Sequence, residues 1–87
     1  MKAVAVDVVR EIMKETGYTN GKLGNAISRN ADVVNKRLNQ QELGAGVLAE
    51  MVAAMGYKVV VMKNDAKVPE DAYEVAPGRI GKAGGPK

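Results

Sequence analysis

The first half of the chain alternates apolar and polar residues with the period of an α-helix. Val6, Val9 and Ile12 are three residues apart, which predicts a helix over residues 4–15 with these side chains on one buried face. Gly17 follows at the position where the C-terminus of a helix favours a residue that tolerates positive φ. The chain therefore opens with an amphipathic helix that ends just before this glycine.

Two shorter helices are predicted next. Thr19 or Asn20 can cap the first of them, which stops near Ser28, and Asn30 can cap the second. These cap residues carry side chains that accept hydrogen bonds from the free N–H groups of the first turn. The expected apolar positions of the two helices are Leu23, Ala26, Ile27, Val34 and Leu38.

The period changes in the second half of the chain. A polar loop over residues 39–46, in which Leu43 is expected to reach the core, leads into a fourth helix over residues 47–55. Residues 57–62 then read Y-K-V-V-V-M, a β-branched run that predicts a strand, and residues 72–75 are a candidate returning strand. The predicted fold is therefore mainly α, with four helices followed by a C-terminal β-strand or hairpin.

These elements divide the chain into three parts. Residues 1–62 form a helical domain with its terminal strand, and residues 63–76 are a hairpin return or a dimerisation arm. Residues 77–87 consist mostly of Gly, Pro and Lys, with Ile80 as their one large apolar residue. We expect this basic tail to be disordered, because it has too little apolar surface to bury.

Composition excludes several kinds of chemistry. The 87 residues contain neither Cys nor His, which removes disulfides, thiolate nucleophiles, the usual general base and the commonest transition-metal ligand. No apolar run approaches the ~20 residues of a membrane-spanning helix, and Asp7 interrupts the apolar N-terminus, unlike in a signal peptide. We therefore expect a single-domain cytoplasmic protein that is not an enzyme, uses no cofactor, metal ion or small-molecule substrate, and does not enter a membrane.

The net charge of +3 is unevenly distributed. Residues 18–41 carry four cations against Asp32 alone, residues 42–75 carry an excess of acids, and the tail from residue 76 onward adds three cations. Two basic segments of this kind suit a polyanionic partner. A net charge of this size is also ordinary for the solubility of a small domain, so charge alone leaves both interpretations open.

Two short helices joined by a tight turn, the second with a polar outer face, form the pattern of a helix-turn-helix unit. The segment 23–39, L-G-N-A-I-S-R-N-A-D-V-V-N-K-R-L-N, resembles the helix-turn-helix of the lambda-repressor-like (Cro/XRE-type) family. The resemblance extends over roughly residues 6–61. Its matched positions are an apolar residue, a small residue, two further apolar residues and a closing apolar–Asn pair, namely Leu23, Gly24, Ile27, Val34 and Leu38–Asn39.

This resemblance implies a four-helix domain that binds double-stranded DNA sequence-specifically, as a small transcriptional repressor of the phage or mobile-element type. It also implies that a recognition helix over about residues 31–39 enters the major groove. A small residue at position 24 lets the two helices of the motif cross closely. Ser28 stands at the turn position where the family prefers Gly, so either this residue accepts a strained φ or the turn has another shape.

The apolar pair Val34 and Leu38 decides which side of this helix faces outward. The outward residues are expected to be Ala31, Asp32, Asn35 and Lys36. Asn and Lys are residue types that read the edges of adenine and guanine in a major groove. Asp32 either accepts a hydrogen bond from cytosine N4 or complements the positive N-terminus of its own helix.

Amide and cationic side chains near the ends of the two helices are candidate contacts to the phosphate backbone. They are Asn20, Lys22, Arg29 and Gln40, and the resemblance adds Asn39. Asn30 is either a further DNA contact or only a helix cap, and Lys22 and Arg29 are either phosphate contacts or part of a solvated face. The predicted DNA-binding residues are therefore Asn20, Lys22, Arg29, Asn30, Ala31, Asp32, Asn35, Lys36, Asn39 and Gln40.

Residues 57–62 predict a homodimer. One face of the expected strand is almost wholly apolar and the other only partly polar, so a single hairpin cannot cover both. An exposed apolar strand tends to pair with another copy of itself. The residues expected to hold the dimer are Tyr57, Val59, Val60, Val61 and Met62. The alternative is a hairpin that folds back on the helices of its own chain.

A second function class remains open. The same helical fold could serve as a protein-interaction module, such as an antitoxin or an inhibitor of a host defence complex, that does not read DNA. In that case the pair Ala31 and Asp32 marks the altered surface, because an acid that faces phosphates lowers the affinity for DNA.

Overall fold

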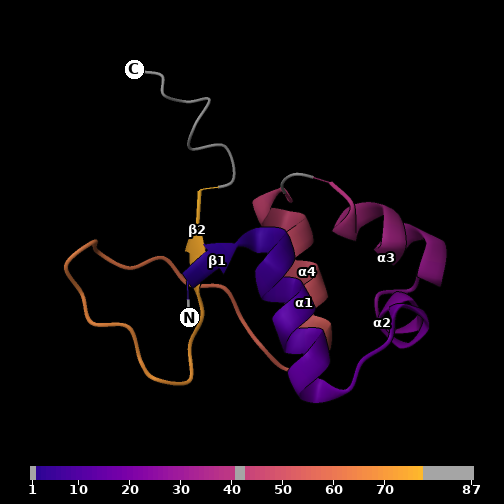
Figure 1. Cartoon of the computed structure of the whole chain (residues 1–87), viewed down its shortest axis with the longest axis horizontal. Helices are drawn as coiled ribbons and strands as arrows, with labels where there is room; N and C mark the ends of the chain where they lie inside the picture. Colours follow the sequence, from indigo (N-terminus) through magenta and orange to yellow (C-terminus); the bar gives the residue numbers. More distant parts are fainter. Residues whose placement is uncertain (1, 41–42, 78–87) are drawn as a thin grey trace.

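The computed structural model describes residues 2–40 and 43–77, and the fold is mainly helical (Figure 1). Four helices and two short strands lie in these ranges. In chain order they are β1 (Lys2–Val4), α1 (Ala5–Thr16), α2 (Asn20–Ala26), α3 (Ala31–Leu38), α4 (Ala45–Ala54) and β2 (Glu74–Ala76). The four predicted helices are confirmed to within about two residues at their ends, and the predicted tail beyond Pro77 lies outside the described residues.

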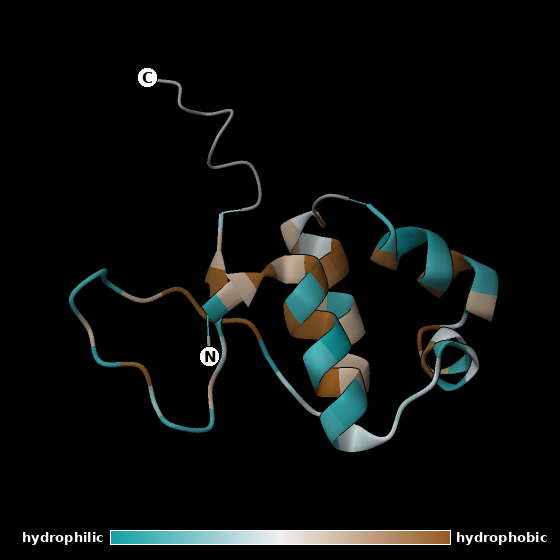
Figure 2. Ribbon diagram, viewed as in Figure 1, coloured by the Kyte–Doolittle hydropathy of each residue, from teal (hydrophilic) through white to brown (hydrophobic). Residues whose placement is uncertain are grey.

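The core is built from aliphatic and methionine side chains of all four helices. Its largest fully buried members are Val9 and Ile12 of α1, Leu23 of α2, Val34 of α3 and Met51 of α4. Burying one such side chain contributes about 1.5–3 kcal/mol. Leu43 packs half-buried against this cluster, as predicted, and Figure 2 shows polar residues on the outward side of α1 and α3. Helix α1 contacts α3, α4 and both strands, and α2 packs against α3 and α4.

Local signals set the junction between the first two helices. Gly17 has a φ of 79°, in the left-handed region, and its N–H donates to the carbonyl of Met13. Thr19, rather than Asn20, is the N-cap of α2, because its Oγ1 accepts a hydrogen bond from the N–H of Lys22 at 3.1 Å. Gly and Thr are residue types that these two positions favour.

The C-terminal segment differs from the prediction. Residues 57–62 form no strand, and no hairpin joins them to residues 72–75. Instead β2 pairs in parallel with β1, and Ala3 lies opposite Val75 in the middle of a three-residue ladder. The predicted strand is wrong because a β-branched run becomes a strand only where a partner strand and a covering layer accept it. Within the described chain nothing covers residues 59–62, which are all exposed.

Three side chains fasten this segment to the end of α1. The hydroxyls of Tyr57 and Tyr73 both donate to Oε1 of Glu15, each at 2.8 Å, and the two ring centroids are 6.1 Å apart. The hydrogen bond from Tyr73, followed by that from Tyr57, lowers the pKa of Glu15. The hydrogen bond between Tyr73 and Glu15 also raises the pKa of Tyr73 to about 12. An ionised Tyr73 could no longer donate this hydrogen bond, and its negative charge would lie beside that of Glu15. The chain between the two tyrosines is therefore a loop closed by a Glu15–Tyr57–Tyr73 clip.

We expect the clip to be visible in the titration of Tyr73. Glu15→Gln should lower the pKa of Tyr73 from about 12 towards the ordinary value of about 10. Because folding favours the protonated phenol, the contribution of Tyr73 to stability is complete below pH ~10 and is lost as the pH rises through about 12. The contribution of Glu15 is present above its ordinary pKa and is lost as the pH falls through its lowered pKa.

The measurement is an ultraviolet titration of tyrosinate in the wild type and in Glu15→Gln. Asp7→Asn is the matched control, because Asp7 is an exposed acid of the same helix that takes no part in the clip. Superimposable titration curves for the wild type and Glu15→Gln would contradict the clip.

Candidate nucleic-acid interface

Helices α2 and α3 touch through their backbones. A Cβ atom built on Gly24 would overlap the carbonyl carbon of Asn30 and would lie 2.5 Å from its oxygen and 2.9 Å from the nitrogen of Ala31. Only glycine fits such an approach without a backbone shift. The expectation that a small residue at position 24 lets the two helices cross closely is therefore confirmed. The contact fixes where α3 begins relative to α2.

The turn between the two helices contains a strained residue. Ser28 has a φ of 60°, the one positive φ among the non-glycine residues that the structure describes. Its N–H donates to the carbonyl of Asn25 at 3.1 Å, and the N–H of Arg29 donates to the carbonyl of Gly24 at 2.7 Å. Of the two possibilities that the sequence left open, a strained Ser28 or a turn of another shape, the structure shows the strained residue. The left-handed conformation of Ser28 costs about 1–2 kcal/mol.

Helix α3 begins at a side-chain cap. Oδ1 of Asn30 accepts a hydrogen bond from the N–H of Val33 at 3.0 Å, so Asn30 is the N-cap that the sequence predicts. Asp32 lies in the first turn, where a negative charge complements the helix N-terminus. The cap uses the oxygen of the Asn30 amide and leaves its Nδ2 group outside this bond.

The buried side of α3 leaves four residues facing outward. Val34 is 0% and Leu38 is 6% exposed, so both lie in the core. The outward residues are Ala31, Asp32, Asn35 and Lys36, as predicted. One turn further, Nδ2 of Asn39 donates to Oδ1 of Asn35 in a long, weak hydrogen bond of 3.5 Å. This bond leaves the amide N–H groups of Asn35 free to donate.

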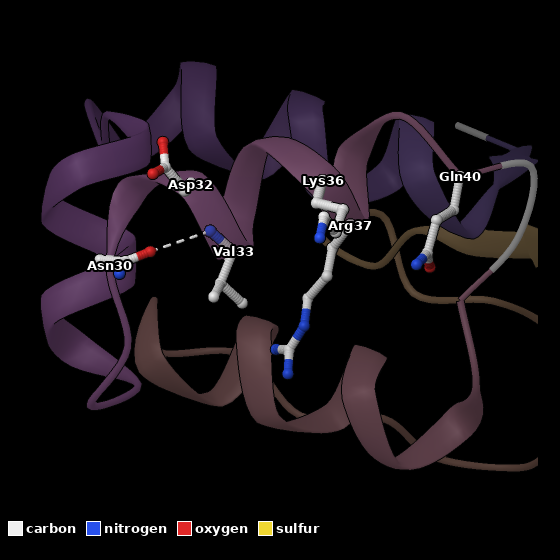
Figure 3. Close-up of a pocket in the computed structure, with 6 residues that line it drawn as sticks. All are labelled: Asn30, Asp32, Val33, Lys36, Arg37 and Gln40. Atoms are coloured by element: carbon white, nitrogen blue, oxygen red, sulfur yellow. Dashed lines mark hydrogen bonds between the residues drawn. The ribbon is translucent and has the colours of Figure 1, made fainter.

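Two charged contacts hold the C-terminal half of α3 against its neighbours. Nη2 of Arg10, from α1, donates to the carbonyl oxygen of Leu38 at 2.8 Å. Nη1 of Arg37 lies 3.0 Å from Oε1 of Glu50 on α4, and the Arg37 side chain is only 17% exposed. Arg37 stands beside the buried positions of α3, and from sequence alone its side chain is expected to point outward, where it could reach phosphate. That expectation is wrong, and Figure 3 shows the side chain reaching towards α4. The sequence did carry a signal for this pair, because Glu50 is the one charged residue of α4.

A hollow of about 300 Å³ runs along α3. It is lined by Asn30, Asp32, Val33, Lys36, Arg37 and Gln40, as drawn in Figure 3. Asp32 and Arg37 point to opposite sides of the helix. Four predicted DNA-binding residues thus share this hollow with Arg37 and with Val33, and of these last two the sequence did not indicate Val33. The lining carries both signs of charge, so the hollow does not select a small anion.

The remaining predicted residues lie outside the hollow. Ala31, Asn35 and Asn39 are exposed on α3 or at its end, and Lys22 and Arg29 are exposed on α2 and in the turn. Asn20, the first residue of α2, is half-buried. Nζ of Lys22 lies 4.7 Å from the ring centroid of Tyr18, which holds the cation beside the start of α2.

Two other kinds of feature are absent from the part of the chain that the structure describes. Over residues 2–40 and 43–77, no three acidic side chains come together where they could share a metal ion. No helix in these ranges is both long and apolar enough to cross a bilayer. Comparison with protein-family models, with curated proteins and with solved structures gives no match for this chain.

The contact at Gly24 predicts a large difference between two glycines of the same helix. Gly24→Ala should lower the free energy of unfolding by about 1–3 kcal/mol, because α3 must move away from the new Cβ. Gly21→Ala is the matched control: its Cβ would meet only Thr19 Oγ1 at 4.0 Å, so the better helix propensity should raise stability by about 0.5–1 kcal/mol. Urea unfolding measures both, and equal stabilities of the two variants would contradict the close contact.

The strained turn predicts a stabilising substitution. Ser28→Gly should raise the free energy of unfolding by about 0.5–1 kcal/mol, because relief of the left-handed conformation exceeds the entropy that glycine loses on folding. Ser28→Ala keeps the strain and should give no gain. A thermal unfolding series in which glycine is no more stable than alanine would rule out the strained φ.

Proposed function

We propose that this chain is a sequence-specific double-stranded DNA-binding protein, a small transcriptional regulator of the repressor type, with α3 lying in the major groove. The observation that carries the proposal is the polar face of α3, which is exposed while the opposite face is fixed in the core. The major groove of B-DNA admits an α-helix, and the side chains of such a face reach base edges there.

The outward residues of α3 have the chemistry for reading bases. Asn35 can bond adenine through its amide, because its N–H groups are free to donate to N7. Lys36 can donate to the O6 and N7 acceptors of guanine, and the methyl group of Ala31 can contact the methyl group of thymine. Asp32 accepts a hydrogen bond from cytosine N4 in this arrangement, which turns an acid on a DNA-facing surface into a source of specificity.

The cations around α3 supply the attraction to phosphate. Lys22, Arg29 and Lys36 are exposed, and none of them forms an ion pair within residues 2–40 and 43–77. Lys36 is assigned to a base contact, so if Lys22 and Arg29 each neutralise one phosphate, the logarithm of the binding constant falls with the logarithm of salt concentration with a slope of about −2, at about −0.9 per contact. Arg37 adds nothing to this slope while Glu50 holds it.

Asp32 also favours one alternative. An acid near the start of α3 weakens attraction to phosphate, so the same helix could present its face to another protein instead. The two functions differ in one respect that an experiment resolves: only the DNA-binding function requires Asn35 and Lys36 for the preference between duplexes.

The test begins with a duplex enriched by the full-length chain from a random pool, with a scrambled duplex as reference. Asn35→Ala and Lys36→Ala should each weaken binding to the enriched duplex about 10–100-fold and leave the scrambled duplex unaffected, because each removes a base contact. Lys22→Ala should weaken binding to both duplexes alike, and the slope of the logarithm of the binding constant against the logarithm of salt concentration should become shallower by about 1.

Lys14→Ala is the matched control, since Lys14 is an exposed lysine of α1 away from α3. Fluorescence anisotropy at two salt concentrations measures all variants. If no duplex is enriched, or if Asn35→Ala and Lys36→Ala bind like the wild type, DNA reading is contradicted and a protein partner takes its place.

A further inference from the structure

The exposed large apolar side chains of the described chain all lie in one segment. They are Val59, Val60, Val61, Met62, Val68 and Val75, and Val61 is 98% exposed. The helices, by contrast, keep their large apolar residues at least partly buried. A soluble chain that gathers its apolar surface in one place marks an interaction site.

This segment is presented as a closed loop. The loop over residues 58–72 begins and ends at the clip on Glu15, and β2 continues from it into the pairing with β1. Two turn hydrogen bonds lie within the loop. The N–H of Ala66 donates to the carbonyl of Lys63 at 3.0 Å, and the N–H of Ala72 donates to the carbonyl of Pro69 at 3.1 Å. Because the ends of the loop are fixed in the free chain, the loop itself loses less conformational entropy when a partner binds to it.

The loop projects from the end of the molecule opposite to α2 and α3 (Figure 1). The longest dimension of the described chain, 38 Å, runs between these two ends. A partner on the loop therefore leaves the exposed face of α3 uncovered.

The charges of the loop indicate what kind of partner it fits. Its cations, Lys58, Lys63 and Lys67, are matched in number by its acids, Asp65, Glu70 and Asp71. None of the six takes part in an ion pair in the part of the chain that the structure describes, where the two pairs are Lys2–Glu74 and Arg37–Glu50. A neutral loop has little attraction for nucleic acid or for an anionic membrane, both of which select net positive charge.

The order of these charges is self-complementary. The lysines lie mainly in the first part of the loop, and Glu70 and Asp71 lie at its end. Around a two-fold axis, two copies of such a loop bring the basic part of one against the acidic part of the other, twice. The four consecutive apolar residues 59–62 are then covered by the same contact.

We propose that the loop over residues 58–72 is a self-association surface, on which a second copy of the chain packs its own loop around a two-fold axis. The contact requires no strand, and it excludes Tyr57, whose hydroxyl is bound to Glu15. It goes beyond DNA binding and does not depend on it. A loop of this size offers fewer than the ~20–30 residues per partner of a standard interface, so the dissociation constant lies in the micromolar range.

The first test is sedimentation equilibrium of the full-length chain without DNA, from micromolar to several hundred micromolar concentration. The wild type should show a monomer–dimer equilibrium, and the double variant Val60→Ser with Val61→Ser should weaken it at least tenfold. Both side chains are exposed, so the fold is unaffected. Ala53→Ser, an exposed apolar position on α4, is the control and should leave the dissociation constant unchanged.

A second test uses the charges. The triple variant Lys58→Glu, Lys63→Glu, Lys67→Glu and the triple variant Asp65→Lys, Glu70→Lys, Asp71→Lys should each be monomeric alone. An equimolar mixture of the two should form heterodimers that weaken with salt. The proposal is overturned by a wild type that stays monomeric at the highest concentration, by a dimer indifferent to the loop variants, or by a mixture that does not associate. Because no DNA is present, these outcomes are independent of the proposed DNA binding.

Discussion

The backbone contact between Gly24 and the Asn30–Ala31 peptide is the constraint on which the placement of the exposed face of α3 depends. It brings α2 and α3 closer than any side chain at position 24 would allow. The turn that permits this approach forces Ser28 into a left-handed conformation, so part of the stability of the domain is used at this point. The contact fixes the start of α3 relative to α2, and it thereby fixes which side of α3 faces outward.

Helix α1 connects the two ends of the molecule. Near its middle, Arg10 holds the last carbonyl of α3, and at its C-terminal end Glu15 holds both tyrosines of the loop. The same helix therefore supports both exposed surfaces, the outer face of α3 and the loop over residues 58–72. The two surfaces differ in chemistry. One surface is polar and lies on a helix that three elements hold in place; the other is apolar with balanced charges and lies on a closed loop.

Local sequence features predicted most of the helical part. Caps and glycines marked the helix ends, and the spacing of Val34 and Leu38 identified the outward residues of α3. Such features need only neighbours within a turn or two of the chain. The strained turn was one of two possibilities that the family resemblance implied, because Ser28 stands at the turn position where that family prefers Gly.

The long-range contacts could not be predicted in the same way. The pairing of β1 with β2 joins three residues near the start of the chain to three near residue 75, too few for any periodicity to reveal. In the clip, Glu15 is joined to Tyr57, which lies 42 positions further along the chain, and to Tyr73, which lies 58 positions further. Nothing in the local sequence pattern indicates these contacts. Residues 57–62 have the composition of a strand, but strand formation depends on a partner strand, and this segment has none within residues 2–40 and 43–77.

The most direct test of the central claim is an NMR titration of the full-length chain with its enriched DNA duplex. If α3 lies in the major groove, the largest amide shift changes should fall on residues 19–40, above all Asn35 and Lys36, with little change over residues 58–72. Changes concentrated on the loop, or none on α3 at saturating DNA, would contradict the account.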